Sequence, residues 1–249
     1  MSARDRLVEL LAEPPVDRAG PEPWLDLVDG RPGSRGRIQD VWESGGGALW
    51  YDGLLAAGDA TEGWVPDLLG GASVRAFYRV ADRLGLSGGE TVLDLACGPG
   101  TLTRRLSTAV GPQGLVVASD LSIPMLSRAT RAIRSPNVAF LRADAMDLPL
   151  RDDTVDAVCC SLCLHLVPDV DTALNGIARV LRPGGRVALA VPAHGSGLGR
   201  RLTETLSRVA QARLFDAGEL AAALSRRGFG EVRERETRGL QLVDAAAPH

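Results

Sequence analysis

From residue 91 onward the sequence alternates between short apolar runs and segments with helical spacing, and this alternation constrains the fold more than any other feature. The apolar runs are rich in small and β-branched residues, as expected of strands buried on both faces of a sheet. They span residues 91–96, 114–120, 138–144, 155–164 and 186–192. Such alternation predicts a doubly wound α/β fold with a mostly parallel sheet. Because ligands of these sheets bind at the carboxyl ends of the strands, residues that end strands are the candidate functional residues.

Helix signals complete this pattern. Helical segments are predicted at residues 73–85, 101–110, 122–134, 169–185, 198–211 and 215–229. Ser122 is a candidate N-cap with Pro124 in the first turn, and a Pro-Gly-Gly turn at 183–185 is a candidate helix end. The last two runs, 231–237 and 240–246, are predicted to form an antiparallel pair.

The first 85 residues differ in composition from the rest. Residues 13–35 are rich in Pro, Gly and Asp, which favours turns and at most short strands. The tryptophans and tyrosines all lie in this part: Trp24, Trp42, Trp50, Trp64, Tyr51 and Tyr78. We therefore predict two units, an N-terminal segment over residues 1–85 that covers the substrate side as a lid, and a ligand-binding core over residues 86–249.

Composition excludes several classes of protein. All 28 basic residues are arginine, so chemistry that needs a lysine Schiff base is not possible. The net charge of −3 gives no reason to expect a nucleic-acid partner. No apolar run approaches the roughly 18 residues that span a bilayer, and the N-terminus is too charged for a signal peptide. We expect a soluble cytoplasmic protein that does not act at a membrane.

The stretch TVLDLACGPGTLTRRL contains a candidate cofactor-binding turn. Asp94 lies near the end of an apolar run and is followed by Gly98 and Gly100, where a backbone without side chains can approach a ligand closely. A dinucleotide fingerprint, G-x-G-x-x-G, needs a third glycine, but its position holds Thr103 in one alignment and Thr101 in the other. A dinucleotide is therefore disfavoured, although this motif alone does not exclude one.

The segment DLACGPG contains, in order, an acid, a hydrophobic residue, a small residue, any residue, Gly, any residue and Gly. This order resembles the first motif of class I S-adenosylmethionine-dependent methyltransferases, with Ala96 in place of the first glycine. Three later stretches agree with this family: VVASDLS with Asp120, LRADAMDLPL with Asp144, and ARVLRPGGRVALAVP. The core is most similar to the ubiquinone and menaquinone biosynthesis type and its small-molecule relatives. The resemblance covers residues 90–192 well and extends more loosely to residue 246.

This resemblance implies a site for S-adenosylmethionine, with S-adenosylhomocysteine as the product. Asp94 would lie near the ammonium group of the cofactor, Asp120 would accept hydrogen bonds from the ribose hydroxyls, and Asp144 would face the adenine. The predicted cofactor-binding set is Tyr51, Asp94, Ala96, Gly98, Gly100, Asp120, Leu121, Met125, Asp144, Ala145 and Ser161. The resemblance also implies a seven-stranded sheet whose last pair is antiparallel.

The resemblance adds expectations about tyrosine and cysteine residues. Tyr51 matches the tyrosine of a Tyr-Asp pair that relatives place over the cofactor. The N-terminal segment loosely resembles a module that can carry a cysteine zinc site, but no cysteine precedes Cys97, so we expect no metal. Cys160 and Cys163 form a C-x-x-C inside a predicted strand without a second ligand pair, which indicates buried structural cysteines.

Two histidines that follow predicted strands, His165 and His194, are candidate general bases, with loop orientation or packing as the alternative for each. The predicted reaction is methyl transfer to an oxygen, carbon or nitrogen atom of a small molecule, and the tryptophan-rich N-terminal segment favours an aromatic or quinone-like acceptor. Two alternatives stay open: a protein that binds the cofactor without methyl transfer, and an NAD(P)-dependent oxidoreductase. Nothing in the sequence indicates an oligomeric state.

Overall fold

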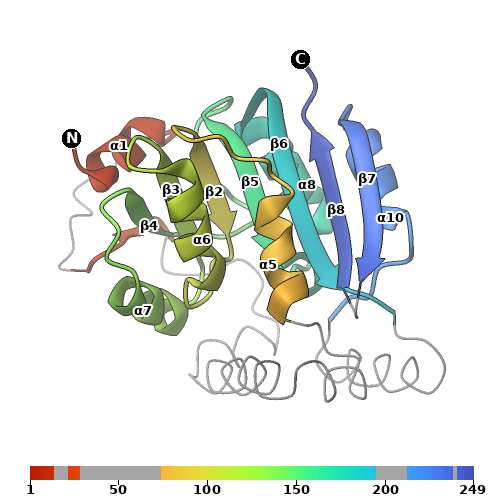
Figure 1. The fold of residues 1–249 in the computed structure, drawn as a ribbon, viewed down its shortest axis with the longest axis horizontal. Coiled ribbons are helices and arrows are strands. Elements are labelled where there is room, and N and C mark those ends of the chain that lie inside the picture. Colours follow the sequence, from red (N-terminus) through yellow and green to blue (C-terminus); the bar gives the residue numbers. More distant parts are fainter. Residues whose placement is uncertain (14–21, 29–73, 195–211, 238–239) are drawn as a thin grey trace.

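The computed structural model describes residues 1–13, 22–28, 74–194, 212–237 and 240–249. These residues form one eight-stranded sheet with helices on both faces (Figure 1). The strands are β1 (Leu25–Asp26), β2 (Thr91–Leu95), β3 (Leu115–Asp120), β4 (Val138–Arg142), β5 (Val155–Ser161), β6 (Leu181–Pro192), β7 (Gly230–Thr237) and β8 (Leu240–Ala246). Their order is β1-β4-β3-β2-β5-β6-β8-β7, with all neighbours parallel from β1 to β6. The predicted doubly wound, mostly parallel sheet is thereby confirmed.

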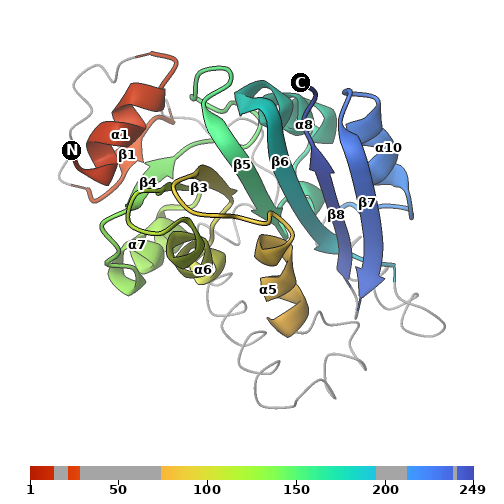
Figure 2. The same cartoon turned by 45° about the horizontal axis from the view of Figure 1, so that its top comes forward.

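Two hydrophobic cores separate the helices into two layers. The helices are α1 (Ala3–Leu10), α5 (Val74–Asp82), α6 (Thr101–Val110), α7 (Ile123–Ala132), the 3₁₀ helix η1 (Leu164–Leu166), α8 (Val170–Val180) and α10 (Glu219–Ser225). Helices α1, α8 and α10 contribute Leu7, Leu174 and Leu224 to one core. Helices α6 and α7 contribute Leu106 and Leu126 to the other core, which α5 shares (Figures 1 and 2). Among the described residues, no helix is both long and apolar enough to cross a membrane.

Most predicted element boundaries agree with the structure. Helix α6 spans the predicted residues, Ser122 caps α7 by accepting a hydrogen bond from Met125 N, and β7 and β8 pair antiparallel. The helix predicted to reach residue 185 instead ends at Val180, because β6 begins at Leu181 and includes the Pro-Gly-Gly turn as an irregularity in its pairing with β5. The helix predicted at 198–211 lies outside the described residues.

The described parts of the N-terminal segment pack onto the core. Strand β1 pairs with the edge of β4, which gives the sheet one strand more than the seven expected from the resemblance. Leu7 of α1 is fully buried against the sheet, and Arg6 Nη1 donates a hydrogen bond to Gly114 O at 2.8 Å. A two-residue strand leaves no periodic signal in the sequence, so β1 was not predictable. The division into a segment over 1–85 and a core over 86–249 stays a prediction.

Candidate cofactor-binding site

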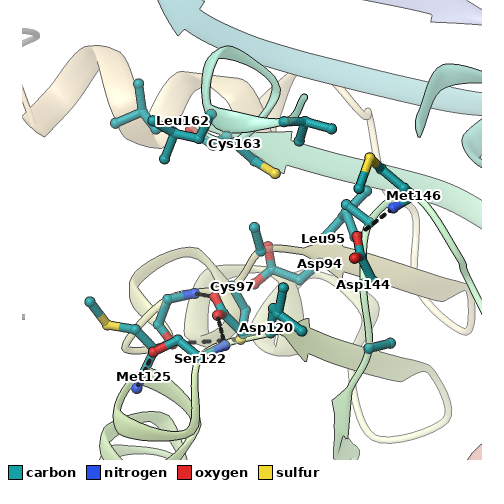
Figure 3. A pocket seen from close by; sticks show the side chains of 18 of the residues that line it. Asp94, Leu95, Cys97, Asp120, Ser122, Met125, Asp144, Met146, Leu162 and Cys163 are labelled. Carbon is teal, nitrogen blue, oxygen red and sulfur yellow. Dashed lines mark hydrogen bonds between the residues drawn. The ribbon is translucent and has the colours of Figure 1, made fainter. Parts of the chain in front are cut away.

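A cavity lies at the carboxyl ends of four adjacent strands, β4, β3, β2 and β5, where the order of the chain through the sheet reverses. All predicted cofactor-binding residues within the described chain line it except Gly100: Asp94, Ala96, Gly98, Asp120, Leu121, Met125, Asp144, Ala145 and Ser161. Tyr51 lies outside the described residues. Figure 3 shows the acidic side chains on one side of the cavity and Leu162 and Cys163 across from them.

The turn after β2 depends on backbone conformations that glycine adopts most readily. Gly98 has φ +56° and a Cβ there would meet no atom within 4 Å, so this position leaves the cavity open to a ligand. Gly100 has φ +87° and a Cβ would lie 2.4 Å from Ile133 Cδ1, which makes Gly100 a packing residue behind the turn and not part of the cavity wall. Ala96 also has a positive φ of 58°, at a cost of about 1–2 kcal/mol for a residue with a Cβ.

Asp120, at the end of β3, organises the floor of the cavity. Its Oδ2 accepts a hydrogen bond from Gly98 N and its Oδ1 from Ser122 N, both at 2.8 Å (Figure 3). Burial raises the pKa of this carboxyl above its usual value, and these backbone hydrogen bonds act in the opposite direction. Each carboxylate oxygen retains a further lone pair, so Asp120 can still accept hydrogen bonds from a ligand in the cavity.

Asp94 lies deeper, in β2, and is 2% exposed. Its Oδ2 accepts a hydrogen bond from Thr103 Oγ1 at 2.6 Å. Burial raises the pKa of Asp94 to about 7; the Thr103 hydrogen bond lowers it, and the nearby charge of Asp120 raises it. In the sequence, Thr103 shows only that a third glycine is absent; its contact with Asp94 forms only when α6 packs behind β2, so no sequence pattern indicates it.

Asp144 supplies the third carboxyl of the cavity from the loop after β4. Its Oδ1 accepts a hydrogen bond from Met146 N at 2.9 Å, so the loop folds back around its own acid (Figure 3). Burial raises the pKa of Asp144, and neighbouring Asp147 raises it further. Arg142, at the end of β4, ties this region to the N-terminal segment, since it forms an ion pair with Asp26 of β1 and donates to Leu121 O at 3.0 Å.

The opposite wall comes from the end of β5 and from η1. Ser161 is buried and its hydroxyl has no hydrogen-bond partner among the described residues. Leu162 has a left-handed φ of 55°, a conformation that is uncommon for a bulky side chain and that recurs at ligand sites. Leu162, Cys163 and the η1 residues were not predicted as part of the site, since nothing in an apolar run indicates a left-handed leucine.

The two predicted bases lie beside this wall but do not line the cavity within the described chain. His165 belongs to η1, and burial lowers its pKa to about 4, so its imidazole is neutral at pH 7. His194 follows β6, and its Nε2 lies 3.6 Å from Asp216 Oδ1. The Nδ1 atom of each histidine is buried without a hydrogen-bond partner among the described residues.

The cysteines give no indication of a metal site. All four are free and buried, and burial raises the pKa of Cys97 and Cys159 well above the usual value, which favours the protonated thiol. No group of three or more potential metal-ligating side chains occurs within the described part of the chain.

The charged side chains that line the cavity indicate which kind of nucleotide-like ligand it can bind. Three carboxyl groups and no basic side chain line it, as far as the structure describes the chain. Gly98 N, a donor that a pyrophosphate could use in such a turn, already donates to Asp120. This environment disfavours a phosphate-bearing dinucleotide and fits S-adenosylmethionine, which has an amino-acid end, ribose hydroxyls and no phosphate.

Comparisons with known proteins agree with this geometry. Residues 92–185 match a family described as a methyltransferase domain. The ubiquinone/menaquinone biosynthesis C-methyltransferase UbiE of Vibrio campbellii is 40% identical over 126 residues, which cover 49% of this chain and 49% of that protein. The chain thus matches about half the length of such curated relatives.

Solved structures share the fold. An S-adenosylmethionine-dependent methyltransferase from Aquifex aeolicus is 25% identical, with a TM-score of 0.56 over 68% of this chain and 87% of that one. The [4+2]-cyclase SpnF is 21% identical, with a TM-score of 0.60 over 71% of this chain and 81% of that one. Since this fold is found in proteins named for different reactions, the fold alone does not identify the chemistry.

Proposed function

We propose that residues 92–185, which match a methyltransferase domain, form a class I methyltransferase domain of the ubiquinone-biosynthesis-like type, and that the chain binds S-adenosylmethionine in this cavity and transfers its methyl group to a small molecule. The observation that carries the proposal is the acid-lined cavity behind the glycine turn, where Asp94, Asp120 and Asp144 come together. The bound cofactor would supply an already activated methyl group. The protein would act from the cytoplasm, with neither a nucleic acid nor a membrane as its partner.

Each carboxyl has a distinct role in the proposal. Asp120, fixed by two backbone N–H groups, would accept the hydroxyls of the ribose. Asp144 and the backbone beside it would face the adenine edge, and Asp94 would lie near the ammonium group of the amino-acid end. The chain would contribute chiefly by orienting the methyl donor and acceptor in line and by excluding water.

The acceptor we propose is an aromatic or quinone-like molecule, methylated at carbon. UbiE, named as a C-methyltransferase of quinone biosynthesis, supports this choice, and oxygen or nitrogen acceptors are its alternatives. The cavity wall formed by Leu162, Leu166 and Val167 is apolar, which suits a flat aromatic ring.

A phenolic acceptor needs a base, and we assign this role to His165 in preference to His194. Leu166, next to His165 in η1, lines the cavity; the low pKa leaves the imidazole of His165 unprotonated but makes it a weak base, so the role requires that the bound acceptor reach this histidine. His165→Gln is expected to lower kcat by about 100-fold without changing the dissociation constant of S-adenosylhomocysteine. The matched variant His194→Gln is expected to keep kcat; a loss confined to His194→Gln would transfer the role to that residue.

Calorimetric titration with S-adenosylmethionine and S-adenosylhomocysteine tests cofactor binding. The Asp120→Ala variant is expected to bind at least about 30-fold more weakly, because two hydrogen bonds that shape the turn and the ligand contacts are lost together. Asp152→Ala is the control, since this side chain is 70% exposed and pairs with Arg179 on the surface. Absence of binding to the unaltered protein would refute the proposal.

One alternative function is that of a protein that binds the cofactor without transferring its methyl group; the structural neighbour SpnF is named as a [4+2]-cyclase and not as a methyltransferase, which keeps this alternative open. Accumulation of S-adenosylhomocysteine in the presence of candidate acceptors separates the two functions. A parallel titration with NADH tests the dinucleotide alternative, for which no binding is expected.

A further inference from the structure

One buried polar contact of the cavity has no role in the function proposed above. Thr103 donates its Oγ1 hydrogen bond to Asp94 Oδ2 at 2.6 Å, and Thr103 is 0% exposed. We propose that Thr103 is a positioning residue that favours the carboxylate form of Asp94 and directs its other oxygen at a cationic group of the ligand. This inference rests on the proposed function, because it concerns how the same cavity recognises the ammonium end of its cofactor.

The placement of Thr103 follows from the turn that precedes it. Helix α6 begins at Thr101, directly after Gly100, so Thr103 lies in the first helical turn behind the strand that carries Asp94. The close approach of Gly100 to Ile133 seats this turn against α7. Thr103 therefore reaches Asp94 from the side away from the cavity, while Asp94 itself is part of the cavity wall.

The groups around Asp94 are otherwise unfavourable to a negative charge. Asp120 faces it from the end of β3 and raises its pKa, and the protonated thiols of Cys97, Cys159 and Cys160, which approach from the turn and from β5, bring no positive charge. No basic side chain lines the cavity within the described chain. The Thr103 hydroxyl is thus the contact that favours the carboxylate before a ligand enters, and it lowers the pKa of Asp94 against the effect of burial.

A cationic ligand then supplies the positive charge that the protein does not. Because Asp94 titrates near neutral pH, the entry of an ammonium group is coupled to the loss of a proton from Asp94. The affinity for a ligand with such a group is expected to fall as pH decreases through about 7. Without the Thr103 hydroxyl, the same fall is expected at higher pH.

The test is a pH series of S-adenosylhomocysteine titrations with Thr103→Val, which keeps the shape of the side chain but removes the donor, and Thr103→Ser, which keeps the donor. Thr103→Val is expected to move the midpoint of the pH dependence upward by about one unit, and Thr103→Ser to restore it. Near pH 7, Thr103→Val is therefore expected to bind S-adenosylhomocysteine several-fold more weakly than the unaltered protein does. At high pH the affinities of the two proteins are expected to converge.

Other outcomes overturn the inference. A pH profile of Thr103→Val that superimposes on that of the unaltered protein, or a uniform loss of affinity without a shifted midpoint, would show that Thr103 only packs. If Thr103→Val does not fold, Asp94→Asn provides a second test, since it must abolish the pH dependence; a retained midpoint would refute the role of Asp94. Failure of the unaltered protein to bind at any pH would instead refute the proposed function.

Discussion

The two sides of the cavity differ in how their polar groups are satisfied. On the side built by β2, β3 and β4, every carboxyl has a partner within the protein: Asp94 has Thr103, Asp120 has two backbone N–H groups, and Asp144 has the N–H of Met146. These partners fix the carboxyls before any ligand arrives.

On the side built by the end of β5 and by η1, the hydroxyl of the lining residue Ser161 lacks a partner among the described residues, and so do His165 Nδ1 and His194 Nδ1, which lie outside the lining of the cavity. A buried polar atom without a partner costs free energy, so such atoms persist where a ligand or another group completes them. The three carboxyls that line the first side are thus preorganised, whereas the Ser161 hydroxyl on the second side is left for a ligand to complete.

The largest effect is expected from breaking the turn on the preorganised side. Gly100→Ala adds a methyl group at φ +87° that collides with Ile133, so the free energy of unfolding should fall by about 3 kcal/mol. Gly98→Ala is the matched control: it has the same kind of backbone strain but no collision, and should cost about 1 kcal/mol. Denaturant unfolding measures both, and equal losses would contradict the role given to Gly100.

An effect of similar size, visible only as a function of pH, is expected at Asp94. Between about pH 4 and 7 this carboxyl is ionised in the unfolded chain but protonated in the folded protein, so folding binds a proton. The contribution of Asp94 to stability therefore decreases as pH rises through this window and becomes constant above it. Relative to Asp94→Asn, the free energy of unfolding should fall by on the order of a few kcal/mol from pH 4 to pH 8. If the free energies of unfolding of the unaltered protein and of Asp94→Asn changed with pH in parallel, the raised pKa of Asp94 would be refuted.

The smallest effects compare one hydroxyl on each side of the cavity. Ser122 caps α7, so Ser122→Ala should lower the free energy of unfolding by about 1 kcal/mol. Ser161→Ala should change it by less than about 0.5 kcal/mol, because the lost hydroxyl has no partner in the described chain. Thermal unfolding of the two variants side by side measures both losses of stability. A larger loss for Ser161→Ala than for Ser122→Ala would contradict this expectation.

The preorganised side was also the more predictable from sequence. Its acids lie at or near the carboxyl ends of buried strands, at positions that a local motif specifies, and α6 and the Ser122 cap depend on neighbours along the chain. The role of Thr103 was not predictable, because its partner is nine residues away and the contact requires the packing of a helix on a strand.

The other side depends on conformations that no sequence pattern specifies. The left-handed φ of Leu162 turns the chain from β5 toward η1 and brings Leu162 and Cys163 to the cavity wall. Leucine has no intrinsic preference for that conformation, so it is imposed by tertiary contacts such as the hydrogen bond from Leu162 N to Ala190 O.

The strands at the two ends of the sheet also have a consequence for aggregation. Strand β7 forms one edge with exposed, alternating charges in GEVRERET, a composition that opposes pairing with another chain. At the other end of the sheet, β1 pairs with the last two residues of the apolar strand β4, Leu141 and Arg142, and without it this end of β4 would also be an open edge. A chain that began at residue 86, the predicted start of the core, would lack both β1 and α1 and would present β4 as an unpaired template. The few residues of β1 therefore protect the sheet against self-association.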